Sequence, residues 1–195
     1  MHSAWRQIAV FLLPAVIFAA VFLNAAAAGT APTGVDLAGK PVDPLHANPG
    51  KIVVLVFVRT DCPISNRYAP TIQRISKNYA GKAQFWLVYP DKAESSAAIE
   101  RHLHDYGYTI PALHDPQHSL VKLGQAEVTP EVAVFDAGSQ LVYHGRIDNW
   151  YVSFGRARPA PTTHELDDAI QAALKGNKPA VATAGGIGCY ISDLE

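Results

Sequence analysis

The fold of this chain is decided by KIVVLVFV at residues 51–58 and by RTDCP at residues 59–63, which follows directly. A continuous apolar run rich in β-branched residues favours a strand buried on both faces, as in the centre of a parallel or mixed sheet. After RTDCP, apolar residues recur at the spacing of one helix face: Ile64, Tyr68, Ile72, Ile75 and Tyr79. The sequence therefore predicts a buried strand that leads into a helix through Cys62.

Strands and helices continue to alternate on the C-terminal side of this unit. We expect strands over 84–89, 109–113, 131–135 and 140–147 and helices over 93–106 and 119–123. A further helix is expected to be capped by Thr162 or Thr163 and to run to Leu174, with Gly176 closing it. A small hairpin is expected over 35–42, and Gly138 is expected to supply the unusual dihedral of the turn at 136–139. This order predicts an α/β fold with a mixed central β-sheet flanked by helices.

Composition excludes several classes of protein. The 195 residues are 49% hydrophobic and 17% charged, which is incompatible with an intrinsically disordered chain. Sixteen Lys and Arg against seventeen Asp and Glu give a net charge of -1 without a basic block, so we expect no nucleic-acid partner. Two cysteines are too few for a disulfide scaffold or a four-cysteine zinc site, but they suffice for one redox pair.

The N-terminus has the pattern of an export signal. Arg6 precedes an apolar run over 8–23, and small residues follow at 24–29. We expect a signal peptide over 1–28, an exported domain over 29–175 and a flexible tail over 176–195. Without cleavage, the apolar run would anchor the protein in the inner membrane, and a membrane partner is expected only in that case. Both interpretations place the folded part outside the cytoplasm, in the periplasm or secreted, where a disulfide can persist.

Cys62 occupies a position where thiols become reactive. The N–H groups and the partial positive charge at a helix N-terminus stabilise a thiolate. Pro63 suits the first helical position because it needs no helical N–H partner there. Arg59 and Arg67 could add positive potential at the Cys62 sulfur, whereas Asp61 opposes it. The sequence does not show which of these charges dominates. The alternative is an inert, buried structural cysteine.

These segments resemble a known family. KIVVLVFV, the turn at 60–65, and Val128-Thr129-Pro130-Glu131 before the next strand are similar to the thioredoxin fold and its redoxin branch. That branch includes TlpA-like thiol:disulfide oxidoreductases and the alkyl hydroperoxide reductase/thiol-specific antioxidant proteins. The resemblance implies a cis peptide bond at Pro130 beside Cys62, with Thr129, Ser65, Arg59 and Arg146 as supporting residues.

Two departures from the family pattern limit the reactions that this protein is expected to catalyse. Ser65 replaces the second cysteine of a Cys-x-x-Cys motif, so rapid exchange between two thiols within one helical turn is excluded. Leu55 and Arg59 stand at the proline and hydroxyl positions of the peroxidatic peroxiredoxin motif, which makes peroxidase activity the less favoured interpretation. Asp61–Tyr68, Gly145–Asp148 and Gly188–Ile191 are similar to segments of less characterised exported bacterial redoxin-domain proteins.

Cys189 lies beyond the last helix in the glycine-rich segment 183–191. Such a tail could bring it onto Cys62 as a resolving thiol, giving a dithiol–disulfide pair. Two alternatives remain. One is a permanent structural disulfide. The other is a Cu(I) site formed by both sulfurs with a histidine such as His118, since thiolates select Cu(I) and exported thioredoxin-fold proteins similar to the Sco copper chaperones bind it in this way.

The leading hypothesis is a thiol:disulfide oxidoreductase without a cofactor, with Cys62 as nucleophile and a protein or small-molecule thiol or disulfide as partner. A copper-delivery protein without catalysis and a redox-inert interaction domain are the alternatives. His102 and His104 are two apart on a helix and face different directions, which makes them poor ligands for one metal, and we expect both on the surface. Trp150, Tyr151 and Phe154 are expected to pack the hairpin, with any exposed part available for docking.

Overall fold

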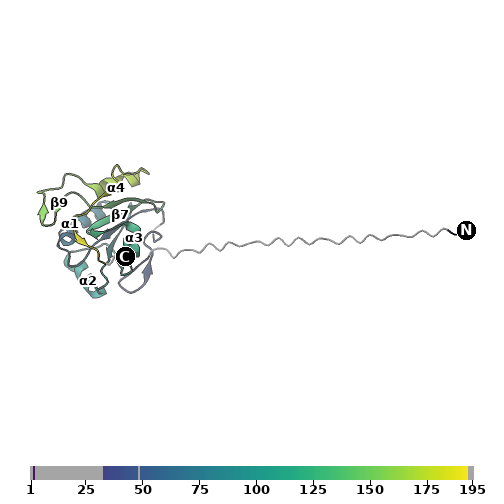
Figure 1. Ribbon diagram of the computed structural model, residues 1–195, viewed down its shortest axis with the longest axis horizontal. Coiled ribbons are helices and arrows are strands. Elements are labelled where there is room, and N and C mark those ends of the chain that lie inside the picture. The colour runs from purple at the N-terminus through teal and green to yellow at the C-terminus, as the bar shows by residue number, and fades with distance from the viewer. Residues whose placement is uncertain (1, 3–32, 48, 193–195) are drawn as a thin grey trace. The chain divides into compact units, whose positions relative to one another are not determined.

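The computed structural model describes residues 2, 33–47 and 49–192 (Figure 1). The chain divides into units over 1–30 and 31–195, and the second unit is the one described below. The expected signal peptide over 1–28 lies outside the described residues, apart from residue 2, so its cleavage stays a prediction. No helix within the described ranges is long and apolar enough to span a bilayer.

The central sheet is built around β3 (Ile52–Phe57), all six residues of which are buried. One neighbour, β4 (Ala83–Tyr89), runs parallel to it, and the other, β7 (Glu131–Phe135), runs antiparallel. With both edges paired and both faces covered, β3 has no contact with solvent, which explains its continuous apolar sequence. The expected central strand is confirmed.

Five shorter strands complete this sheet on its two sides. Beyond β4 lie β5 (Ala112–His114), β1 (Gly34–Val35) and β2 (Pro41–Val42), and beyond β7 lie β8 (Leu141–Gly145) and β11 (Thr183–Ala184). The strand order is β11-β8-β7-β3-β4-β5-β1-β2, with parallel and antiparallel pairs in one sheet. The expected mixed sheet and the small N-terminal hairpin are both confirmed.

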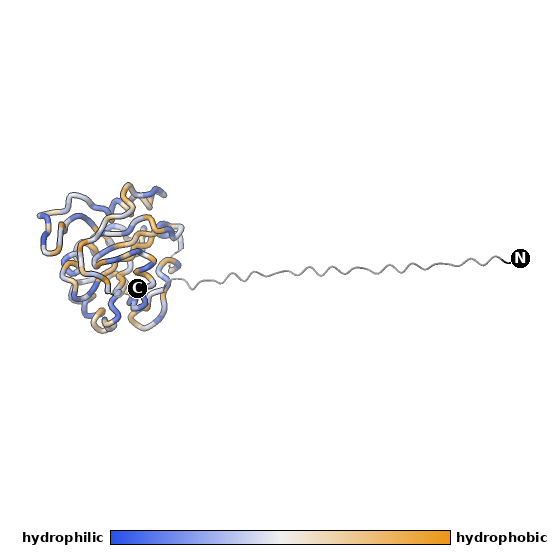
Figure 2. Tube along the Cα trace, viewed as in Figure 1, coloured by the Kyte–Doolittle hydropathy of each residue, from blue (hydrophilic) through white to orange (hydrophobic). Residues whose placement is uncertain are grey.

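In the described part of the chain, four helices cover the two faces of the sheet: α1 (Pro63–Asn78), α2 (Ser96–Asp105), α3 (Ser119–Gly124) and α4 (Glu165–Leu174). Alternate residues of β3 serve opposite faces. Val54 and Val56 join the core cluster that includes α1, α2 and α4 residues, whereas Leu55 packs with α3 residues. Figure 2 shows the hydrophobic colouring concentrated along the central segments of the domain. The sheet with its flanking helices therefore rests on two separate apolar layers.

Two local expectations are wrong. The positive φ in the turn between β7 and β8 belongs to Ser139 (φ 61°) and not to Gly138. The Asp136 carboxylate accepts hydrogen bonds from the N–H groups of Gly138 and Gln140, which shapes this turn through a side chain. The residue that caps α4 is His164, without a side-chain cap bond, whereas Thr162 and Thr163 bond elsewhere.

Two small ladders lie outside the main sheet. The first pairs β9 (Tyr151–Ser153) with β10 (Arg156–Ala157). The second pairs β6 (Val128–Thr129) with β12 (Cys189–Tyr190), so the end of the described chain returns to the segment before Pro130. The C-terminal segment is folded onto the domain through β11 and β12. The expected flexibility of this tail stays a prediction, and any release must break these contacts.

Alkaline titration tests the packing of the cores. Burial raises the pKa of five tyrosines, and that of Tyr79 rises to about 12; the others are Tyr68, Tyr89, Tyr108 and Tyr143. Above about pH 10 the unfolded chain loses phenol protons that the folded chain keeps, so the free energy of unfolding falls as pH rises. We expect a loss of about 1.4 kcal/mol per pH unit for each such tyrosine.

The measurement is urea unfolding between about pH 9 and 11, with phenolate absorbance recorded in parallel. Phenolate should appear together with unfolding. Normal titration of all tyrosines near pH 10 with an intact circular dichroism spectrum would contradict the expected packing.

Candidate functional site

Cys62 is the N-cap residue of α1 and its side chain is completely buried. The backbone N–H of Ser65 donates to Cys62 Sγ at 3.5 Å, so the sulfur takes the place of the usual capping oxygen. Pro63 occupies the first turn of the helix, as expected. The N-terminus of α1 therefore presents a hydrogen-bond donor to the sulfur.

The segment before Pro130 forms the opposite wall. The Thr129–Pro130 peptide bond is cis, which confirms the expectation. Cys62 Sγ donates to the carbonyl oxygen of Thr129 at 3.0 Å, so β6 lies directly beside the sulfur. Thr129 is fully buried, and its hydroxyl donates to the carbonyl oxygen of Cys189 at 3.4 Å.

Cys189 approaches the same place from the C-terminal segment. It lies opposite Thr129 in the antiparallel pair of β12 and β6. Both cysteines are free thiols and are not at disulfide distance, but their side chains hydrogen-bond to each other. The structure thus brings together two cysteines that lie 127 positions apart in the sequence.

The two thiols differ in acidity. Burial opposes ionisation of Cys62, but donors on Cys189, Ser65 and Thr129 outweigh it, and the pKa of Cys62 is lowered. Burial, together with the contact with Cys62, raises the pKa of Cys189 to about 12. The buried Ser65 hydroxyl forms no hydrogen bond beside the neutral thiol, and it can donate to the sulfur once Cys62 ionises. Cys62 is the thiol that ionises first.

We call residues 183–191 the strap, because they cross over β6 and Cys62. The carboxylate of Glu131 accepts hydrogen bonds from the N–H of Gly186 and from the N–H groups of residues 127 and 128, which ties the strap to β6. Ile191 is buried, and its N–H donates to the carbonyl oxygen of Glu127. A Cβ on Gly188 would lie 1.9 Å from the Thr129 oxygen, so only glycine permits this approach.

Arg59 connects the strap to the loop before Cys62. Its guanidinium pairs with Asp61 at 3.1 Å and with Asp91 at 3.0 Å, and it donates to the carbonyl oxygen of Tyr190 at 3.4 Å. The sequence left open whether Arg59 or Asp61 dominates the electrostatic potential near Cys62. In the structure the carboxylates of Asp61 and Asp91 together offset the positive charge of Arg59. Among the described contacts, Arg59 acts on the strap and not on Cys62.

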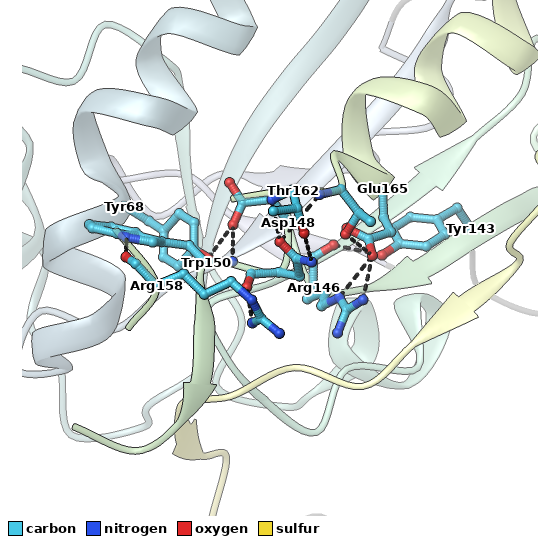
Figure 3. Close-up of polar contacts among 10 residues, drawn as sticks. Tyr68, Tyr143, Arg146, Asp148, Trp150, Arg158, Thr162 and Glu165 are labelled. Carbon is cyan, nitrogen blue, oxygen red and sulfur yellow. Dashed lines mark hydrogen bonds and ion pairs between the residues drawn. The ribbon is translucent and has the colours of Figure 1, made fainter. Parts of the chain in front are cut away.

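Arg146 lies on the other side of Pro130. Its guanidinium pairs with Glu165 (Figure 3). Arg146 also lines a small pocket together with Pro130 and Asp148. In the same network the Tyr68 hydroxyl donates to Asp148 at 2.6 Å, which joins α1 to the segment after β8. Within the described region, the guanidinium of Arg146 hydrogen-bonds Glu165 and not Cys62, so it supports the wall behind Pro130.

The aromatic residues after β8 separate into two groups. Trp150 and Tyr151 pack with Tyr68 of α1, and the guanidinium of Arg67 lies 5.8 Å from the centre of the Trp150 ring. Phe154 is 63% exposed and lines a groove with Cys189 and Tyr190. The exposed part of the cluster is therefore beside Cys189.

The proposed third copper ligand lies elsewhere. His118 is buried, and its Nε2 bonds the carbonyl oxygen of Pro90 at 2.9 Å. Within residues 33–47 and 49–192, no three His, Cys, Asp or Glu side chains are arranged to hold a metal ion. The copper set of Cys62, Cys189 and His118 is therefore not assembled, because the fold directs His118 toward the Pro90 backbone.

Behind Cys62 lies a series of hydrogen-bonded polar side chains that was not predicted from the sequence. His102, expected at the surface, is buried, bonding the Tyr89 hydroxyl and the Asn66 amide oxygen, both at 2.8 Å. Asn66 in turn donates to the carbonyl oxygen of Thr60 at 3.0 Å, in the loop before Cys62. Burial lowers the pKa of His102. The sequence contained one indication that His102 is buried: it lies three residues after Ile99, and this spacing places both residues on the same helix face.

Comparisons with known proteins agree with this geometry. A redoxin family model matches residues 26–150, which is 125 of the 195 residues. No curated protein matches the sequence.

Solved structures show the same fold. An uncharacterised conserved protein from Geobacillus kaustophilus superimposes with a TM-score of 0.71 at 22% identity, covering 82% of this chain and 86% of that one. A hypothetical protein from Sinorhizobium meliloti gives 0.69 at 23% identity, covering 82% and 88%. A thiol:disulfide interchange protein of the thioredoxin family from Chlorobium tepidum gives 0.53 at 19% identity, covering 74% and 94%.

The acidity of Cys62 is directly measurable. In a reduced Cys189→Ser variant, where the serine hydroxyl can still donate, we expect iodoacetamide alkylation to show an inflection below the reference thiol value of about 8.5. In Cys189→Ala the donor is lost, so the inflection should move upward. An inflection at or above about 8.5 in the serine variant would show that burial outweighs the donors.

Proposed function

The chain belongs to the redoxin family and has a thioredoxin-like fold, and from this premise we propose that it is an exported thiol:disulfide oxidoreductase. In this proposal Cys62 is the nucleophile and Cys189 is the resolving thiol. The observation that carries it is the contact between the two free thiols at the N-terminus of α1. Export rests on the sequence of residues 1–28.

The chemistry follows from the difference in acidity. The Cys62 thiolate attacks one sulfur of a substrate disulfide, forms a mixed disulfide and expels the other substrate sulfur as a thiolate. Cys189, deprotonated, then attacks Cys62 Sγ, which forms the Cys62–Cys189 disulfide and releases the second substrate thiolate. The substrate is reduced by two electrons and the cysteine pair is oxidised by two. Because thiol exchange is reversible, an external dithiol returns the pair to its reduced state.

The acidity of Cys189 should change during this cycle. Burial raises the pKa of Cys189 first, and the hydrogen bond and charge of Cys62 raise it further, whereas Arg59 lowers it. In the mixed disulfide Cys62 carries no charge, so its contribution disappears. Cys189 therefore becomes easier to deprotonate at the stage at which it must attack.

Access to Cys62 requires movement of the strap. The Cys62 side chain has no exposed surface, and a protein disulfide must contact its sulfur directly. Release of β12 from β6 would open this path, and its return would bring Cys189 back to the mixed disulfide. Thr129, Pro130 and Ser65 form the fixed wall in this scheme, and Arg59 holds the strap through Tyr190.

Adjacent thiols also support a second candidate, a copper-delivery module. Thiolates select Cu(I), and Cys62 and Cys189 are already in contact. Since His118 is directed elsewhere, the two sulfurs would be the protein ligands. Stoichiometric copper that is lost in Cys62→Ser and retained in His118→Ala would favour this function.

A trapping experiment tests the oxidoreductase. Incubated with glutathione disulfide, the Cys189→Ser variant should accumulate a mixed disulfide on Cys62, because the resolving thiol is absent. Wild-type protein should instead accumulate the Cys62–Cys189 disulfide, visible by mass spectrometry after alkylation. A permanent structural bridge predicts a lower melting temperature in the variant without any trapped species. If the variant keeps full exchange activity and traps nothing, Cys189 is not the resolving thiol.

A further inference from the structure

The two sulfurs differ sharply in their access to solvent. Cys62 is 0% exposed and belongs to the apolar core cluster that includes α1. Cys189 is half-buried and lines an open groove of about 510 Å³. Phe154 and Tyr190, which are 63% and 79% exposed, stand on the same groove. With the strap docked, Cys189 is the more accessible of the two cysteines to an external thiol.

The docked position of the strap is specified by the sequence. A Cβ on Gly188 would meet the Thr129 oxygen at 1.9 Å, and one on Gly186 would meet the Glu131 side chain at 2.6 Å. Gly145 on β8 has a φ of 130°, and a Cβ there would lie 1.9 Å from the oxygen of Ala184. Gly188 and Gly145 therefore permit backbone contacts that a side chain would prevent, and Gly186 leaves room for the Glu131 side chain, so these glycines fit the strap to the domain.

Disulfide formation is compatible with this docked position. The side chains of Cys62 and Cys189 are already in hydrogen-bond contact. A disulfide requires the two sulfurs to be about 2.0 Å apart. Because the two side chains are already adjacent, a small movement of these side chains suffices to form the bond. The strap can thus remain on β6 in the oxidised protein, with the Cys62 sulfur behind it and Cys189 in front.

The leaving groups favour the same direction of attack. Attack on Cys189 expels Cys62, whose thiolate is stabilised by the N–H of Ser65 and by the start of α1. Attack on Cys62 would expel Cys189, whose thiolate is disfavoured because burial raises the pKa of this thiol. The less basic thiolate leaves faster, so access and leaving-group chemistry agree.

We propose that reducing equivalents enter this protein at Cys189, through the groove lined by Phe154 and Tyr190, and that Cys62 is the leaving group. The proposal rests on the proposed function and specifies how that cycle is completed. A thiolate of a dithiol reductant attacks Cys189 Sγ; the bond to Cys62 breaks, and Cys62 leaves with the electron pair. The second thiolate of the reductant then attacks the reductant's own bonded sulfur and expels Cys189, which takes up a proton. The reductant becomes a disulfide, and the pair gains two electrons.

A monothiol probe stops the reaction at the mixed disulfide, because it has no second thiol to complete the reduction, and the mixed disulfide shows which cysteine was attacked. The wild-type protein is oxidised with diamide, freed of oxidant, treated briefly with reduced glutathione, and quenched with acid before alkylation. Peptide mass spectrometry then identifies the glutathionylated and the alkylated cysteine. We expect glutathione on Cys189 and the alkyl group on Cys62, in excess of the reverse pattern by about tenfold or more.

Two alanine variants in the strap provide matched controls. Gly185→Ala adds a Cβ that meets nothing within 4 Å, so it should keep the wild-type pattern. Gly188→Ala forces β12 away from Thr129, so it should expose Cys62 and shift glutathione toward it. If Gly188→Ala does not fold, the wild-type protein and Gly185→Ala still decide the result.

The outcomes separate the two proposals. A Cys62–Cys189 disulfide that accepts glutathione mainly at Cys62 in the wild-type protein overturns the entry point and leaves the proposed function intact. Failure to form any Cys62–Cys189 disulfide with diamide overturns the proposed function and the entry point together. Glutathione on Cys189 in the wild-type protein and in Gly185→Ala supports both.

Discussion

The site depends on the backbone of Thr129, which contacts both cysteines. Its carbonyl oxygen accepts the Cys62 thiol at 3.0 Å, and the residue pairs with Cys189 across β6 and β12. Since a backbone carbonyl cannot be removed by substitution of a side chain, this contact is set by the path of the chain before Pro130. The position of either sulfur relative to the other therefore follows from the position of β6.

The acidity of Cys62 is a balance between two opposing effects of the same enclosure. Burial removes water from the sulfur and disfavours the thiolate, whereas the enclosing residues supply donors that favour it. A second cysteine at position 65 would place the partner thiol within the same helical turn. Here Ser65 occupies that position, and the partner thiol comes from the strap. The nucleophile and its partner are consequently joined by tertiary contacts that can change independently of α1.

The glycines of the C-terminal segment have a different role from the one their sequence indicates. A glycine-rich segment favours flexibility when it is read alone. In the structure Gly186 and Gly188 allow the strap to lie closer to Glu131 and Thr129 than any other residue could. The two roles are compatible, because a segment held by a few backbone contacts and by Arg59 can be well placed and still be released at a modest free-energy cost.

The central strand, the helix that begins after Cys62, the mixed sheet and the cis bond at Pro130 could all be predicted from the amino-acid sequence. These features follow from local patterns: an apolar run of strand length, helical spacing, and a proline in a family motif. Three placements could not be predicted in this way: His102 is buried against Asn66, His118 turns toward Pro90, and Cys189 lies opposite Thr129. Those placements depend on contacts between residues tens of positions apart, and side-chain periodicity carries no information about which distant segment will cover a given face. The same reason explains the burial of Cys62: the strand and helix around it are local, but the strap that covers it comes from the far end of the chain.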